Sequence, residues 1–129
     1  MPIELRMLAL SVLLGFVHIF LSAHATTKQY GLDWNMGARD QPMPPLDQLA
    51  GRLHRASNNF SETFPLFAAA VLIALFAGRQ GALTVWGTQL YFWARVVYLP
   101  LYAFGIPVLR TIVWTAAMVG VALNLAALL

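Results

Sequence analysis

The sequence predicts an all-α integral membrane protein built as a bundle of four transmembrane helices. Hydrophobic residues make up 60% of its 129 residues and charged residues only 10%, and the mean hydropathy is +0.69. Soluble domains are roughly 45–50% apolar and roughly 25% charged. A soluble domain of this size would have too few charges to cover its surface, and disorder requires low hydrophobicity. Long charge-free runs separated by glycine and proline turns complete the pattern.

We expect spans at about 5–25, 50–78, 82–104 and 107–128, all within one domain over residues 1–129. The runs Met7–Thr27 and Thr111–Leu129 contain no Asp, Glu, Lys or Arg and are long enough to cross a bilayer. The second span starts in a polar helical segment and continues through the charge-free run 63–78. The third joins two charge-free runs that flank Arg95. We expect the first span to be a membrane helix and not a cleaved signal peptide.

Turn residues separate these spans. Gly78-Arg79-Gln80-Gly81 predicts a tight break between spans two and three, and Gly105-Ile106-Pro107 predicts another between spans three and four. Between spans one and two, residues 28–48 hold three prolines and most of the acidic residues, so this segment is the one polar loop.

The basic residues predict the orientation of the chain. Arg6 and Arg79 fall on one side of the membrane, whereas Lys28, Arg39, Arg52, Arg55 and Arg110 fall on the other. Because positive charge accumulates on the cytoplasmic side, we expect the long loop to face the cytoplasm and both termini to lie opposite.

Composition also excludes several kinds of function. The basic residues are scattered singly, without the cluster that nucleic-acid binding requires, although the pI is about 9.8. The chain has no cysteine, so thiolate nucleophiles and disulfides are absent. The sequence also lacks the cluster of histidine and carboxylate residues that a metal site would need. We therefore expect neither a nucleic-acid partner nor a metal.

Polar side chains inside membrane helices are costly, and here they fall on shared faces. Span two carries Arg52, Arg55, Asn59 and Glu62 at helical spacing, and span three carries Tyr91, Arg95, Tyr98 and Tyr102. Span four carries Arg110 near its start. With the predicted orientation, these groups converge in the cytoplasmic half of the membrane. Guanidinium, carboxylate, amide and phenol groups together suit a small anionic or zwitterionic ligand.

These residues resemble a known family. The segment Arg55-Ala56-Ser57-Asn58-Asn59-Phe60-Ser61-Glu62-Thr63-Phe64-Pro65 is similar to the R-A-x-x-N-x-x-E-x-x-P segment of the MAPEG family, the membrane-associated proteins of eicosanoid and glutathione metabolism. Arg95, Tyr98, Tyr102 and Arg110 resemble the pattern of its third and fourth helices. The resemblance covers the whole chain and is closest to bacterial-type members similar to microsomal glutathione transferases.

The resemblance implies a homotrimer that binds glutathione between subunits near the cytoplasmic face. Arg110 matches the arginine that holds the glutathione sulfur as a thiolate. The residues that match the family's glutathione contacts are Arg52, Arg55, Asn59, Glu62, Arg95, Tyr98 and Tyr102. The implied activity is that of a glutathione transferase or peroxidase, with glutathione as co-substrate and a lipophilic electrophile or lipid hydroperoxide as second substrate. Its partners would be membrane lipid and further copies of the chain.

The sequence departs from the family pattern at some positions. Gly51 replaces a glutamate that often precedes Arg52, and Thr63 replaces a tyrosine of some eicosanoid-making members. An arginine that often ends helix one is absent, with only His24 and Lys28 nearby. A non-catalytic lipid-binding or structural member is the alternative to an enzyme. An accessory subunit of a larger membrane assembly is a further alternative.

Structural interpretations compete with functional ones at single positions. Arg52 and Arg55 could anchor the helix at the membrane surface, and Glu62 could pair internally with an arginine. Tyr98, Tyr102 and the tryptophans, Trp114 among them, could be belt or lipid-facing aromatics. For His18 we favour a hydrogen bond between helices over a catalytic role.

Overall fold

The computed structural model describes residues 1–129 and is entirely helical apart from turns and one loop. The all-α prediction is confirmed. The helices are α1 (Ile3–Tyr30), α2 (Leu32–Met36), α3 (Gln48–Phe76), α4 (Ala82–Ala103) and α5 (Pro107–Ala126).

The first helix and the loop that follows differ from the prediction. α1 continues to Tyr30, beyond the expected end near residue 25, and α2 lies inside the segment predicted as loop 28–48. Helix formation does not stop where hydropathy falls. α1 ends instead at Gly31, whose φ of 100° few other residues adopt. The loop returns along α1, where the Tyr30 hydroxyl donates to the Pro44 carbonyl.

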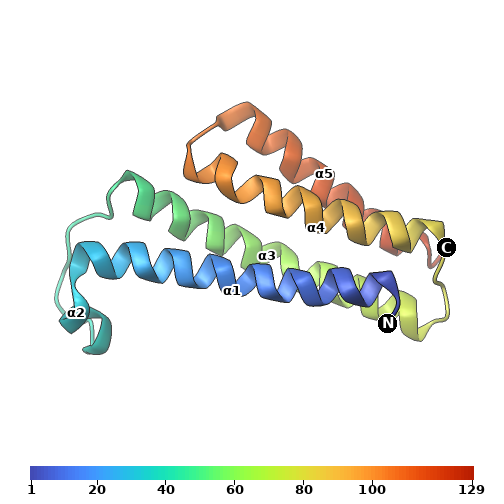
Figure 1. Ribbon diagram of the computed structural model, residues 1–129, viewed down its shortest axis with the longest axis horizontal. Helices are drawn as coiled ribbons and strands as arrows, with labels where there is room; N and C mark the ends of the chain where they lie inside the picture. Colours follow the sequence, from blue (N-terminus) through green and yellow to red (C-terminus); the bar gives the residue numbers. More distant parts are fainter.

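The four long helices form two antiparallel pairs, α1 with α3 and α4 with α5 (Figure 1). α3 and α4 are both central, because each contacts the other three long helices, whereas α1 and α5 do not touch. The N-terminus, the α3–α4 connection and the C-terminus lie at one end of the bundle. α2, the start of α3 and the α4–α5 turn lie toward the other (Figure 1).

Two apolar clusters hold these helices together. Met7, Leu14, Leu53, Ala56, Phe60, Phe92 and Leu99 join α1, α3 and α4. Phe67, Val71, Tyr91, Ala94 and Ala117 join α3, α4 and α5. In the second cluster the rings of Phe67 and Tyr91 stack with centroids 3.9 Å apart. Tyr91 also exchanges a 3.0 Å hydrogen bond with Thr63, so both residues serve the packing of α3 against α4.

α4 and α5 approach closely at two glycines. A Cβ added at Gly120 would lie 2.6 Å from the carbonyl oxygen of Gly87, and one added at Gly87 would lie 2.7 Å from the carbonyl oxygen of Gly120. Both contacts are to backbone, so any larger residue must separate the helices. Small residues that allow such close approach are typical of helix contacts in membranes.

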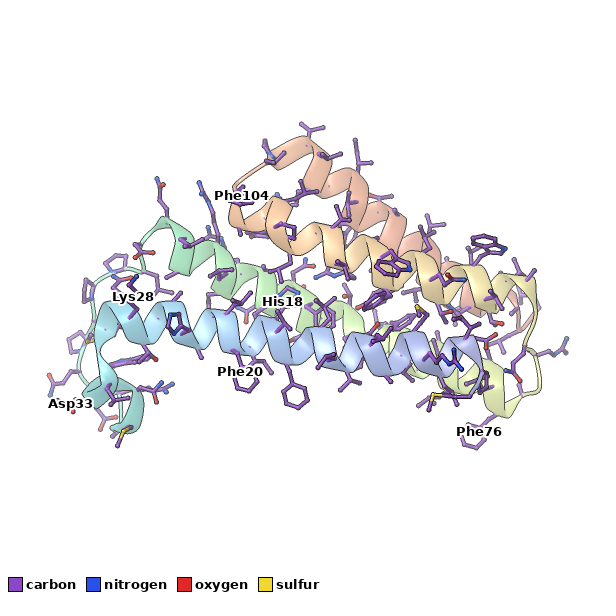
Figure 2. All side chains as sticks on the ribbon, in the orientation of Figure 1. His18, Phe20, Lys28, Asp33, Phe76 and Phe104 are labelled. Carbon is purple, nitrogen blue, oxygen red and sulfur yellow. The ribbon has the colours of Figure 1, made fainter.

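Much of the outer surface is apolar. Only 28 of 129 residues are buried, and the exposed ones include Leu13, Phe16 and Trp86. Figure 2 shows Phe20 pointing away from the bundle, Phe76 at one end of it and Phe104 at the turn between α4 and α5. α1, α3 and α5 are long and apolar enough to cross a membrane. The chain is therefore a membrane protein; α4, with 22 residues, is of similar length but carries the buried Arg95.

Candidate functional site

The candidate site lies where α4 ends and α5 begins. Gly105, with a φ of 72°, turns the chain after α4, and the N–H of Ile106 donates to the carbonyl of Leu101 at 3.0 Å. This is the hydrogen bond of a Schellman motif, which stops α4 sharply. Pro107 then occupies the first turn of α5, where no N–H is needed. The short turn brings the C-terminal end of α4 beside the N-terminal end of α5.

Tyr102 and Arg110 meet across this turn. The Arg110 guanidinium carbon lies 4.7 Å from the centroid of the Tyr102 ring. A guanidinium contacts a ring through its flat face, while its N–H groups point outward in its own plane. The tyrosine therefore holds Arg110 in place and leaves its hydrogen-bond donors free for a ligand.

A pocket of about 300 Å³ opens at this turn. Its lining residues are Arg52, Arg55, Tyr102, Gly105, Pro107 and Arg110. Three guanidinium groups and no carboxylate line it, so it is strongly electropositive and suits an anion with several acceptor oxygens. We call it the arginine pocket.

Two glycines shape the arginine pocket. A Cβ at Gly105 would lie 2.8 Å from the guanidinium carbon of Arg52, and a Cβ at Gly51 would lie 3.1 Å from Nη1 of Arg55. The glycine at position 51, which departs from the family pattern, thus leaves room for Arg55 to fold back along α3.

A second, smaller pocket of about 160 Å³ lies one helical turn further along α5. It is lined by Asn59, Tyr98, Arg110, Thr111 and Trp114. Arg110 is common to both pockets and so forms the boundary between them. We call the smaller one the inner pocket.

Arg95 contacts residues of the inner pocket without lining it. Its side chain is fully buried, and its Nη1 donates a 2.7 Å hydrogen bond to Oδ1 of Asn59. Its guanidinium carbon lies 4.1 Å from the ring centroid of Tyr98. Arg95 therefore contacts two pocket residues and helps to position both.

The structure brings most of the predicted site residues together. Arg52, Arg55, Tyr102 and Arg110 share the arginine pocket, and Asn59 and Tyr98 share the inner pocket with Arg110. Glu62 lines neither pocket and is exposed on the outer surface of α3 in the single chain. An internal pair between Glu62 and an arginine is not formed with Arg95, whose hydrogen bond goes to Asn59.

Sequence reasoning missed Trp114. The sequence favours a belt or packing residue at this position, but Trp114 lines the inner pocket, and its Nε1 is buried without a hydrogen-bond partner. The spacing could have revealed it, because Trp114 follows Arg110 by four residues and therefore shares its helix face.

His18 differs from the sequence interpretation as well. Its ring is buried and stacks on Phe60 with centroids 4.9 Å apart. Neither ring nitrogen has a hydrogen-bond partner within the chain. His18 also lines an apolar groove of about 350 Å³ between α1 and α3, together with Phe16 and Phe64.

Fold and site together define a class of protein: an all-helical membrane protein with an arginine-lined pocket at the α4–α5 turn. The MAPEG family model matches residues 7–129, and the chain belongs to the MAPEG family. A search of curated proteins finds no significant match to the chain.

Proposed function

We propose that the chain is a membrane glutathione transferase or peroxidase that activates glutathione as a thiolate for attack on lipophilic electrophiles. In this proposal α1, α3, α4 and α5 all span the membrane, the chain forms a homotrimer, and the loop 28–48 faces the cytoplasm. MAPEG membership supports the class, since the family includes glutathione transferases as well as non-catalytic members.

The observation that carries the proposal is the position of Arg110 between the two pockets. Glutathione carries two carboxylates, one ammonium group and one thiol. In this proposal the carboxylates bind Arg52 and Arg55, and the sulfur lies toward Arg110. The exposed Glu62 of a neighbouring subunit would then be available to the ammonium group.

Arg110 would favour the thiolate over the thiol. A free thiol has a pKa near 8.5, and only its anion attacks electrophiles well. Lowering that pKa by about 2 units requires about 2.7 kcal/mol of preferential stabilisation of the anion. A charge-assisted contact to a guanidinium at the N-terminal end of α5 would be of this order.

The reaction then needs little further chemistry from the protein. In the transferase reaction the sulfur forms a bond to an electrophilic carbon, and the leaving group departs with its electron pair. A lipophilic substrate would reach the sulfur from the membrane. The protein binds, orients and keeps the sulfur ionised.

The test is a stopped-flow measurement of the ultraviolet thiolate band when purified protein is mixed with glutathione. The wild type should show a saturable band, and Arg110→Ala should lose it together with conjugation activity. Arg79→Ala is the matched control, because Arg79 is an exposed arginine in the α3–α4 turn and lines neither pocket. Arg110→Ala with an intact band would refute the role of Arg110.

A lipid-binding member without catalysis is the second candidate. The apolar groove between α1 and α3, lined by Val12, Phe16 and Phe64, favours it because the groove suits an acyl chain. This candidate predicts no thiolate band in the wild type and retention of lipid through purification.

A further inference from the structure

A polar pocket of about 460 Å³ lies where α1, α2 and the start of α3 meet. Polar and aromatic residues make up most of its wall, among them Ser22, Tyr30, Trp34, Asn35, Arg39 and His54. No residue that lines it also lines the arginine pocket or the inner pocket. We call it the loop pocket, because Arg39 and Leu46 bring the connection between α2 and α3 into its wall.

Hydrogen bonds hold the wall of the loop pocket in place. The side chain of Asn35 donates to Oγ1 of Thr27 at 2.7 Å, which ties α2 to α1. The side chain of Gln29 donates to the carbonyl of Pro45 at 2.9 Å and accepts from the N–H of Asp47 at 2.8 Å. These bonds tie the connection before α3 to the end of α1. A ligand therefore meets a pocket that is already formed, which lowers the free-energy cost of binding.

The loop pocket carries positive charge. The guanidinium carbon of Arg39 lies 4.3 Å from the centroid of the Trp34 ring, and its Nη2 donates to the carbonyl of Asn35 at 3.0 Å. A guanidinium has five N–H donors, so donors remain for a ligand. His54 lines the same pocket, and no carboxylate does. A guanidinium held by its flat face, with its edge free, suits a phosphate group.

The loop pocket continues into the apolar groove between α1 and α3. Ile19 and Ser57 line both cavities, and beyond them the groove follows Phe16 and Val12 along α1. Ser22, in the loop pocket, and Val12 are about 15 Å apart along the helix axis. One leaflet of a hydrocarbon core about 30 Å thick has this depth. A polar end and an apolar groove of leaflet depth together suit an amphiphile.

We propose that the loop pocket and the apolar groove together bind one anionic phospholipid. Its phosphate contacts Arg39, and one acyl chain lies along Ile19, Phe16 and Val12. Basic pockets beside transmembrane helices are a known way of binding anionic head groups. The inference assigns a head group and its contacts, which the apolar groove alone does not, and it does not depend on the thiol chemistry.

The test is native mass spectrometry of purified, delipidated protein titrated with palmitoyl-oleoyl phosphatidylglycerol. We expect saturable binding of one lipid per chain. Arg39→Gln should weaken this binding roughly fivefold or more, which is the factor that one cation contributes beside an anionic lipid. Palmitoyl-oleoyl phosphatidylcholine, which has the same chains and no net charge, should bind more weakly. Lys28→Gln is the matched control, because it removes an exposed cation near the end of α1 that lines neither cavity.

A second pair of variants tests the position of the acyl chain. Ser61 is exposed on α3 and lines the apolar groove, so Ser61→Phe fills the groove without disturbing a buried residue. It should weaken the binding of phosphatidylglycerol and phosphatidylcholine alike. Ala69→Phe is the control, because Ala69 is exposed on the same helix and lines neither cavity.

Several outcomes would overturn the inference, each in a different way. Equal weakening by Arg39→Gln and Lys28→Gln would mean that the attraction is diffuse. Displacement of the lipid by inorganic phosphate would identify a site for a free anion. Full binding to Ser61→Phe would place the acyl chain elsewhere. No lipid binding, with a Ser61→Cys variant that resists a membrane-permeant maleimide, would mean that a second copy of the chain covers the groove.

The thiolate band separates this inference from the proposed function. Arg39→Gln should leave the band unchanged, because Arg39 lines neither the arginine pocket nor the inner pocket. A wild type that shows the band and binds no phospholipid would refute this inference alone. A wild type that binds the phospholipid and shows no band would support this inference and refute the proposed function.

Discussion

At the scale of single residues, the contact between Arg95 and Asn59 is the most consequential. Arg95 is fully buried, and the one hydrogen bond it makes goes to Oδ1 of Asn59 at 2.7 Å. A guanidinium carries five N–H donors and a positive charge. Removing the acceptor of a buried guanidinium therefore destabilises the folded protein. The pair therefore contributes to the stability of the fold as well as to the inner pocket.

We expect Asn59→Ala to destabilise the protein by about 1.5–3 kcal/mol, the usual value for a hydrogen bond to a charged group. Asn59→Asp should stay closer to the wild type, because it keeps the acceptor and adds an opposite charge. Thermal unfolding in detergent, followed by circular dichroism, measures both. Asn58→Ala is the control, since Asn58 is exposed and its side chain hydrogen-bonds only to the exposed His54, at 3.4 Å. Equal losses at positions 58 and 59 would contradict the prediction.

Much of the site could be predicted from residue spacing. Helical periodicity predicts that Arg52 and Arg55 share one face of their helix. Gly105 and Pro107 predict the turn that brings Arg110 beside Tyr102. Composition does not distinguish Trp114 from a belt aromatic, and only its spacing from Arg110 indicates that it faces the inner pocket.

The element scale is dominated by the hairpin of α4 and α5, held close by Gly87 and Gly120. We expect Gly120→Ala to destabilise the protein by about 1–3 kcal/mol, since its Cβ would overlap the backbone of Gly87. Gly81→Ala is the control, because a Cβ at Gly81 meets nothing within 4 Å. Thermal unfolding measures the melting temperatures of both variants. Equal values would show that α4 and α5 can separate at Gly120 without loss of stability.

The helices were predicted more accurately than their ends and connections. Charge-free runs and turn residues located the four long helices, since both follow from hydropathy and local backbone preference. The extension of α1 to Tyr30 and the short α2 were missed, because polar residues such as Lys28 and Gln29 also form helix. The close approach of two backbones at Gly87 and Gly120 depends on tertiary packing, which periodicity does not report.

At the scale of the whole molecule, the proposed orientation can be tested without altering any native thiol. The chain has no cysteine. Single variants Gln41→Cys, in the long loop, and Ala77→Cys, at the end of α3, each introduce one exposed reactive group. In sealed right-side-out vesicles, a membrane-impermeant maleimide should label Ala77→Cys and spare Gln41→Cys. Permeabilised vesicles, in which both variants react, provide the control, and the reverse pattern would invert the topology.

The contact between Gly87 and Gly120 has a consequence for the other end of the hairpin. Gly120 lies ten residues from Arg110, which is about 15 Å along α5. Any tilt of α5 about its contact with α4 at the glycines, which is the fulcrum of that motion, would displace Arg110. A tilt of about 5° at the fulcrum moves Arg110 by about 1.3 Å, and about 1 Å of misplacement is enough to slow catalysis strongly. The position of Arg110 therefore depends on the absence of side chains at Gly87 and Gly120, which lie toward the opposite end of the hairpin.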